Sequence, residues 1–309
     1  GEARLEAFRE VRDELHRRLS VVFPAPSSDE AGSVRKRVSS FYARSIGDGD
    51  GCCSGTGLPR GVLAEMAGYS VDDLADLPEG VPADSFGCGN PLAFSEVNEG
   101  ETVLDLGSGA GLDLIIAAGK VGPRGRVIGV DMTEEMIERA RGNMEGAGLG
   151  NIELREGTIE DLPVESGSVD WVISNCVINL SPEKEKVFAE IFRVLKPGGR
   201  VSISDIVAGD MPGFVRESAD LHCSCISGAI SEEEYLEGLR RSGLADVKVT
   251  SRLVYDEGQL RTLIGSGESG GCCGSGESLP AGLAERAVAA LGGKVASVRF
   301  SAVKPAACP

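Results

Sequence analysis

The stretch DLGSGAG, residues 105–111, decides the fold of this chain. It follows a β-prone and mostly apolar run, 102–106, and it leads into an apolar helical run, 112–121. Glycines between a strand and a helix permit a tight turn and let a ligand approach the backbone closely. The sequence therefore predicts a strand-turn-helix unit with a nucleotide site at its first crossover.

Strand-like and helix-like runs continue to alternate after this unit, which is typical of a parallel sheet covered by helices. Thr133 and Ser181 are predicted to begin two of the helices, and another helix is predicted over 232–242. Further strands are predicted at 126–130, 152–155, 169–174, 201–205, 247–254 and 295–303. The predicted fold class is α/β, with a doubly wound, mostly parallel sheet.

The first part of the chain is more polar than the rest. Residues 1–84 are predicted to form an N-terminal leader with an amphipathic helix near 5–19 and a linker at 24–33. A Gly/Asp-rich loop that contains Cys52 and Cys53 follows. We expect this leader to contribute little to the core.

The remainder, 85–305, is predicted to form one nucleotide-binding domain. Within it we expect a substrate cap at about 206–245, after the fifth strand. A Gly/Ser/Cys-rich insertion is expected at about 265–280, and a short tail at 306–309.

The glycine spacing distinguishes between two kinds of nucleotide site. A dinucleotide site of the G-x-G-x-x-G type needs its third glycine at position 112, which is Leu112. Here the glycines are Gly107, Gly109 and Gly111. This spacing disfavours a nicotinamide dinucleotide.

Acidic residues at strand ends complete the predicted cofactor site. Asp131 ends the second strand, where a carboxylate accepts hydrogen bonds from ribose hydroxyls, and Asp105 suits a cationic amine. Met132 is expected against an adenine face. We also assign Ile159, Glu160 and Asn175 to this site. In the alternative interpretation the glycine turn merely packs helix against strand, and Asp131 merely caps the next helix.

The composition excludes several classes of function. The chain has 31 Lys and Arg against 48 Asp and Glu, a net charge of −17, so nucleic acid and anionic membrane surfaces are poor partners. No run approaches the about 18 apolar residues of a membrane helix, and we expect a cytoplasmic enzyme. Nine cysteines in such a chain favour reduced, functional thiols over structural disulfides. With two histidines, a mechanism that needs a histidine base is disfavoured.

One cysteine has a position that the fold itself explains. Cys176 follows the predicted fourth strand, whose carboxyl end borders the crevice where ligands bind in open α/β sheets. Cys88 precedes the first strand and Cys225 follows the fifth, so both could fold over the same edge. A thiolate prefers soft acceptors, so such a cluster favours a metalloid substrate.

Sequence motifs around these cysteines resemble a known family. The element order, with LKPGG at 195–199, resembles class I S-adenosylmethionine-dependent methyltransferases across about 85–305. Within that superfamily SFGCGNP (85–91), SNCVINL (174–180) and CISGA (225–229) look like arsenite methyltransferases. The resemblance implies a Rossmann-like sheet of the class I type with an arsenic-binding cap.

The resemblance also implies an activity and its ligands. Cys88, Cys176 and Cys225 would hold trivalent arsenic, with Cys52 or Cys53 as a fourth participant. The substrates would be arsenite and methylated arsenite, methylated stepwise from S-adenosylmethionine. A thiol reductant, thioredoxin or glutathione, would restore the cysteines and trivalent arsenic. This reaction detoxifies arsenic and needs no general base.

Two alternatives stay open at this point. A methyltransferase for a small organic acceptor would use the cysteines only structurally, and a non-enzymatic protein would only bind a metalloid. Zinc is disfavoured, because the cysteines lack paired C-x₂₋₄-C spacing. The sequence does not define the oligomeric state or the roles of Cys53, Cys223, Cys272, Cys273 and Cys308.

Overall fold

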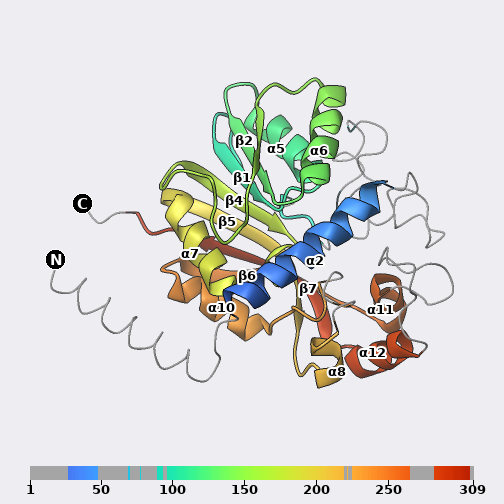
Figure 1. Cartoon of the computed structure of the whole chain (residues 1–309). Coiled ribbons are helices and arrows are strands. Elements are labelled where there is room, and N and C mark those ends of the chain that lie inside the picture. Colours follow the sequence, from blue (N-terminus) through green and yellow to red (C-terminus); the bar gives the residue numbers. More distant parts are fainter. Residues whose placement is uncertain are drawn as a thin grey trace.

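A seven-stranded sheet in the order β3-β2-β1-β4-β5-β7-β6 forms the centre of the computed structural model (Figure 1). The structure describes residues 27–47, 69, 77, 89–92, 96–218, 221, 225–264 and 282–306. The strands are β1 Thr102–Leu106, β2 Arg126–Asp131, β3 Ile152–Glu156, β4 Val169–Asn175, β5 Leu195–Ala208, β6 Ala245–Val254 and β7 Val295–Val303.

The sheet is parallel except at one side. β1 pairs in parallel with β2 and β4, β2 with β3, and β4 with β5, whereas β7 is antiparallel to both β5 and β6. The carboxyl ends of β1, β2 and β4 therefore meet at one edge, which is where ligands bind in such sheets. The predicted doubly wound, mostly parallel sheet is confirmed.

Helices cover both faces of this sheet. Their bounds are α2 Ser28–Gly47, α5 Leu112–Val121, α6 Glu134–Ala147, the 3₁₀ turn η3 Ile178–Leu180, α7 Lys184–Val194, α8 Gly213–Arg216, α10 Glu232–Arg241, α11 Glu257–Ile264 and α12 Leu283–Leu291. Alternate residues of one strand enter different parts of the core. Val103 packs in the cluster that contains α5, and Leu104 in the cluster that contains α7 and α10. Both faces are thus buried, as expected for a mainly parallel sheet.

The fifth strand is longer than the sequence predicted. The expected helix was to continue to Leu195 and stop at the following Pro-Gly-Gly, but α7 ends at Val194 and β5 begins at Leu195. Backbone hydrogen bonds explain the difference. Gly198 N–H donates to the carbonyl of Lys304 at 2.9 Å, and Lys304 N–H donates to that of Gly199 at 2.8 Å. Pairing with the chain after β7 thus extends the strand.

Helix α2 corrects the prediction for the leader. The predicted linker at 24–33 overlaps α2, which begins at Ser28. A capping box starts the helix, because Glu30 N–H donates to Ser27 Oγ at 3.3 Å and Ser27 N–H donates to Glu30 Oε2 at 2.9 Å. Ala31, Val38 and Phe41 of α2 are buried, so this segment contributes to the core.

Several predicted features lie outside the described residues. They are the helix near 5–19, the loop with Cys52 and Cys53, Cys88, the insertion at 265–280 and most of the tail. Within the described ranges, no helix is long and apolar enough to cross a membrane.

Candidate active site

The glycine loop after β1 is shaped for close approach of a ligand. Gly107 has a φ of 62°, and a Cβ there would lie 2.6 Å from the side chain of Val177. Gly109 has a φ of 51°, but a Cβ there would meet nothing within 4 Å. Gly109 lines a pocket, so its missing side chain leaves space inside that pocket.

This pocket lies at the carboxyl ends of β1, β2 and β4. It encloses about 970 Å³ of space including its open mouth, near the upper end of the range for small-molecule sites. The residues that the sequence assigned to the cofactor all line it, namely Asp105, Gly107, Gly109, Gly111, Asp131, Met132, Ile159, Glu160 and Asn175.

Other residues of the pocket wall were not predicted. Arg35, Val38 and Tyr42 come from α2, and Asp113 comes from the first turn of α5. Ser108 also lines the pocket, and its Oγ is buried without a hydrogen-bond partner among the described residues. A buried hydroxyl without a partner costs free energy, so Ser108 provides a ready contact for a polar ligand.

Asp131 connects the glycine loop to the end of β2. Its Oδ2 accepts a hydrogen bond from Gly109 N–H at 2.9 Å, and its Oδ1 accepts one from Thr133 N–H at 2.9 Å. Thr133 precedes α6 as predicted, but its side chain makes no capping hydrogen bond. Asp131 thus fixes the loop and still exposes carboxylate to the pocket, as a ribose site requires.

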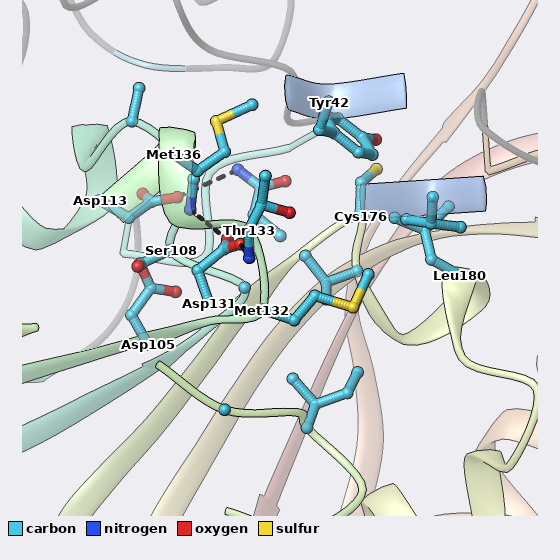
Figure 2. A pocket seen from close by; sticks show the side chains of 18 of the residues that line it. Tyr42, Asp105, Ser108, Asp113, Asp131, Met132, Thr133, Met136, Cys176 and Leu180 are labelled. Atoms are coloured by element: carbon cyan, nitrogen blue, oxygen red, sulfur yellow. Dashed lines mark hydrogen bonds between the residues drawn. The ribbon is translucent and has the colours of Figure 1, made fainter. Parts of the chain in front are cut away.

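Three carboxyl groups converge at one side of the pocket, where Figure 2 shows Asp105, Asp113 and Asp131. Burial, with the charges of Asp113 and Asp131, raises the pKa of Asp105 well above its usual range. Burial raises the pKa of Asp113 to about 6, opposed by hydrogen bonds from Tyr69 and Asn175. Burial also raises the pKa of Asp131. A cationic ligand would relieve this repulsion between buried carboxylates.

A hydrogen-bond network behind this cluster includes a residue from the predicted leader. Tyr69 O–H donates to Asp113 Oδ1 at 2.8 Å. Asn175 Nδ2 donates to Tyr69 Oη at 2.9 Å and to Asp113 Oδ2 at 3.2 Å. The network ties the carboxyl end of β4 to the acidic side of the pocket.

Asn175 also binds the segment that carries Cys88. Its Oδ1 accepts from Gly89 N–H at 3.2 Å, and its Nδ2 donates to the Gly89 carbonyl at 2.5 Å. Gly89 follows Cys88 in the chain, and Asn175 precedes Cys176. A Cβ on Gly89 would lie 2.7 Å from Cβ of Ser204 on β5, so this contact requires glycine. Two segments with candidate substrate cysteines are thus joined through one carboxamide.

Cys176 itself lines the pocket, at the opposite side from the carboxyl groups and near Tyr42 (Figure 2). Cys225 lies beside it, because Cys225 Sγ donates to the Cys176 carbonyl at 2.9 Å. Both cysteines are buried. The Cys176 sulfur is in a disulfide bond in this structure.

Both cysteines have strained backbones. The φ angle is 56° at Cys176 and 61° at Cys225, and Asp246 is the other non-glycine residue with positive φ among those described. For a residue with a side chain this left-handed conformation costs about 1–2 kcal/mol. Strain of this kind concentrates at functional sites.

This strain predicts an unusual order of stabilities at position 176. Under reducing conditions Cys176→Gly is expected to be more stable to urea than Cys176→Ala by about 1 kcal/mol, because glycine adopts the left-handed conformation freely. Both variants lack the thiol, so its loss cancels in the comparison. Ser174 of β4 has no positive φ, so Ser174→Gly is expected to be less stable than Ser174→Ala. The same order at both positions would contradict strain at Cys176.

A partly buried lysine and a buried aspartate lie near Cys225. Lys184 Nζ donates to the carbonyls of Asn179 at 3.2 Å and Ser181 at 2.9 Å. Burial lowers the pKa of Lys184 to about 8, opposed by the charges of Asp205 and Cys225. Burial raises the pKa of Asp205 to about 6, despite hydrogen bonds that favour its charged form.

The predicted thiol set is therefore only partly visible. The structure places Cys176 and Cys225 together, while Cys52, Cys53, Cys88 and the remaining cysteines lie outside the described residues. Across the parts of the chain that are described, no three His, Cys, Asp or Glu side chains form a group suited to a metal ion.

Comparisons with known proteins agree with this geometry. A family model described as a methyltransferase domain matches residues 97–243. The chain is 47% identical over 207 residues to an arsenite methyltransferase of Halobacterium salinarum. The aligned stretch covers 67% of this chain and 52% of that protein. An arsenite methyltransferase of Aquipseudomonas alcaligenes is 36% identical over 214 residues, 67% of this chain and 58% of that protein.

A solved structure extends the comparison to three dimensions. An arsenic(III) S-adenosylmethionine methyltransferase from Chlamydomonas reinhardtii superposes with a TM-score of 0.60 at 32% identity, covering 76% of this chain and 73% of that one. The YcgJ protein of Bacillus subtilis shares the fold, with a TM-score of 0.53 at 22% identity.

Strand order, glycine loop and pocket together define a class I methyltransferase fold. The motifs around Cys176 and Cys225 and the match in three dimensions narrow the assignment. The chain belongs to the arsenite methyltransferase family. It spans about half the length of the curated relatives it matches.

Proposed function

We propose that this protein transfers methyl groups from S-adenosylmethionine to thiolate-bound trivalent arsenic and so detoxifies arsenite. The observation that carries this proposal is the position of Cys176. It lines the same pocket as the glycine loop and the three carboxyl groups, at the other side. A cysteine sulfur that can bind a soft substrate once it is reduced and a site for a cationic donor therefore share one cavity.

The pocket residues fit this donor. S-adenosylmethionine would supply an electrophilic methyl group on a cationic sulfonium, together with a ribose and an adenine. Asp131, Asp105 and Asp113 line the pocket, and we assign Asp131 to the ribose and the other two to positive charge. Ser108 offers its buried hydroxyl, and Gly109 leaves space for close approach.

The substrate side requires thiolates and exclusion of water. Cys176 and Cys225 are both buried, so a metalloid held there would be shielded from solvent. We assign Cys88 as the third ligand and Cys52 as a further participant from the family motifs. Arsenic held by three thiolates keeps a lone pair, which is nucleophilic without a general base. Arsenite and methylated arsenite are the proposed substrates.

A thiol reductant has a defined role in this scheme. The Cys176 sulfur is disulfide-bonded in the structure, so a thiolate forms there only after two-electron reduction. Thioredoxin or glutathione would supply those electrons. The need for reduced cysteines supports a cytoplasmic location, where such reductants keep thiols reduced.

Product analysis tests the proposed function. Protein incubated with arsenite, S-adenosylmethionine and a thiol reductant should release methylated arsenicals, detected by chromatography with mass detection. Protein that is reduced beforehand and then freed of reductant should stop turning over once its thiolates are consumed. Donor binding without any methylated arsenical would contradict the proposal.

The carboxyl cluster predicts how donor affinity depends on pH. Burial raises the pKa of Asp113 to about 6, so below that pH its carboxyl group gains a proton and no longer attracts a cation. The dissociation constant for S-adenosylmethionine is expected to rise about tenfold between pH 7 and pH 5. Calorimetry across this range measures it. Asp113→Asn should bind more weakly at pH 7 and vary less with pH, and an equal affinity of the unmodified protein at pH 5 and pH 7 would refute the electrostatic role.

A further inference from the structure

Helix α2 presents one face to the pocket. Arg35, Val38 and Tyr42, spaced three and four residues apart, lie on the same side of the helix and line the cavity. Val38 is 1% exposed, whereas Lys36 and Arg37, which lie between Arg35 and Val38 in the chain, face solvent. Figure 1 shows α2 running across the molecule and ending beside α6, against which it packs. This helix therefore forms a wall of the site.

Arg35 ties this wall to two loops at the carboxyl edge of the sheet. Its Nε lies 3.2 Å from Glu160 Oε1, and its Nη2 donates to Glu183 Oε2. Glu160 follows β3 and Glu183 precedes α7. The Arg35 guanidinium thus links α2 to two segments that are distant in sequence. Its planar fork of donors suits contact with two carboxylates.

These ion pairs are partly buried. The side chains of Glu160 and Glu183 are 6% and 14% exposed, and that of Arg35 is 25% exposed. Such pairs are screened less than surface pairs, so breaking them has a larger effect. By contrast, the pair of Arg124 with Glu99 is mostly exposed and is expected to contribute little.

Glu160 connects Arg35 to the ligand space. Its Oε1 also accepts from Ser181 Oγ at 2.6 Å, so Arg35 and Ser181 fix the carboxylate from two sides. The structure gives Glu160 Oε2 no hydrogen-bond partner among the described residues. Glu160 lines the pocket, so its second oxygen is available to a donor group of a bound ligand.

We propose that Arg35 is a positioning residue for the methyl donor, acting through Glu160. It holds the Glu160 carboxylate in one orientation and keeps Val38 and Tyr42 against the cavity. The inference rests on the proposed use of S-adenosylmethionine. Helix α2, which was predicted to be part of the linker and leader, thereby becomes part of the donor site.

Donor binding without arsenite is the first test. Calorimetry of the full chain should show that Arg35→Ala raises the dissociation constant for S-adenosylmethionine by about 10- to 100-fold. Arg35→Lys should recover part of the affinity, because a lysine keeps the charge but cannot bridge both carboxylates. Arg37→Ala, on the exposed side of α2, is the matched control and should bind as the unmodified protein does.

A double-mutant cycle separates positioning from a direct contact. If Arg35 acts through Glu160, then Arg35→Ala should have little further effect on donor affinity in a Glu160→Gln background. Additive losses would show that Arg35 acts independently of Glu160. Kinetics should show a raised KM for the donor with an unchanged KM for arsenite.

Hydrogen exchange of α2 supplies a readout that does not depend on turnover. Addition of S-adenosylmethionine should slow amide exchange in 28–47 in the unmodified protein and in Arg37→Ala. This protection should be much smaller in Arg35→Ala, and Arg35→Lys, which keeps the stem and the charge, should show an intermediate effect.

The outcomes distinguish this inference from the proposed function. Unmodified protein that fails to bind the donor would overturn both. Unmodified protein that binds the donor, with Arg35→Ala and Arg35→Lys binding it equally well and protecting α2 equally, would overturn the role of Arg35 alone.

Discussion

Replacing Cys176 with serine is expected to abolish arsenite methylation while leaving S-adenosylmethionine affinity essentially unchanged. Cys176 lines the pocket opposite the carboxyl groups and contacts Cys225 through its carbonyl. A serine hydroxyl is a hard and weakly acidic ligand, so the substrate loses one of its soft donors. We expect kcat/KM for arsenite to fall at least about 100-fold. This is more than the decrease expected when a residue that only supports a ligand is lost.

The measurement combines product analysis with donor calorimetry on the same preparation. Cys308→Ser removes a thiol from the predicted tail and serves as a control for cysteine loss in general. Methylation by Cys176→Ser at the rate of the unmodified protein would remove Cys176 from the substrate site. A joint loss of donor affinity would instead indicate that the pocket itself had collapsed.

Replacing Asp131 with alanine is expected to have the largest effect on donor binding. Its carboxylate holds Gly109 and Thr133 through backbone hydrogen bonds and also faces the pocket. Alanine removes the anchor of the glycine loop together with the acceptor for the ribose hydroxyls. Hydrogen bonds to a charged group are each worth about 1.5–3 kcal/mol, so we expect the dissociation constant to rise at least about 100-fold.

A nearby surface carboxylate provides the control for this variant. Asp161 follows Glu160 in the same loop, but it is exposed and does not line the pocket. Asp161→Ala should therefore bind S-adenosylmethionine like the unmodified protein. Both variants should still bind arsenite, which is measured by the protection of their thiols from alkylation. If Asp131→Ala retained donor affinity, the assignment of the ribose site would be wrong.

The fold was predictable because its signals are local. Strand β1 and helix α5 have the bounds that the apolar pattern predicts, and β7 does as well. The glycine loop directly follows β1 and Asp131 ends β2, so short connections fix both at the carboxyl edge of the sheet. The residues assigned to the cofactor from this pattern therefore gather in one pocket.

The missed residues depend on contacts between distant segments. Asp113 in α5 has the position of an ordinary acidic residue in the first turn of a helix. Its hydrogen bond with Tyr69, from another part of the chain, becomes visible only in three dimensions. Nothing in the local sequence indicates that Arg35 reaches both Glu160 and Glu183.

Helix α2 is a different case, because its start was marked. Prolines and serines at 24–28 suggested a linker, but Ser27 and Glu30 form a capping box that is readable from sequence spacing. The prediction gave more weight to the breakers before the helix than to this signal. As a consequence, α2, which forms a wall of the pocket, was predicted to belong to a leader that contributes little to the hydrophobic core.

A single-turnover experiment shows whether arsenic held by this protein accepts the methyl group. Reduced protein is loaded with one equivalent of arsenite, freed of unbound arsenic and mixed with S-adenosylmethionine that carries a labelled methyl group. We expect the label to appear on arsenic in a one-to-one ratio with the demethylated donor, and we expect no transfer in Cys176→Ser. If the label is found on the protein, or stays on the donor, while unmethylated arsenic remains bound, arsenic is not the methyl acceptor.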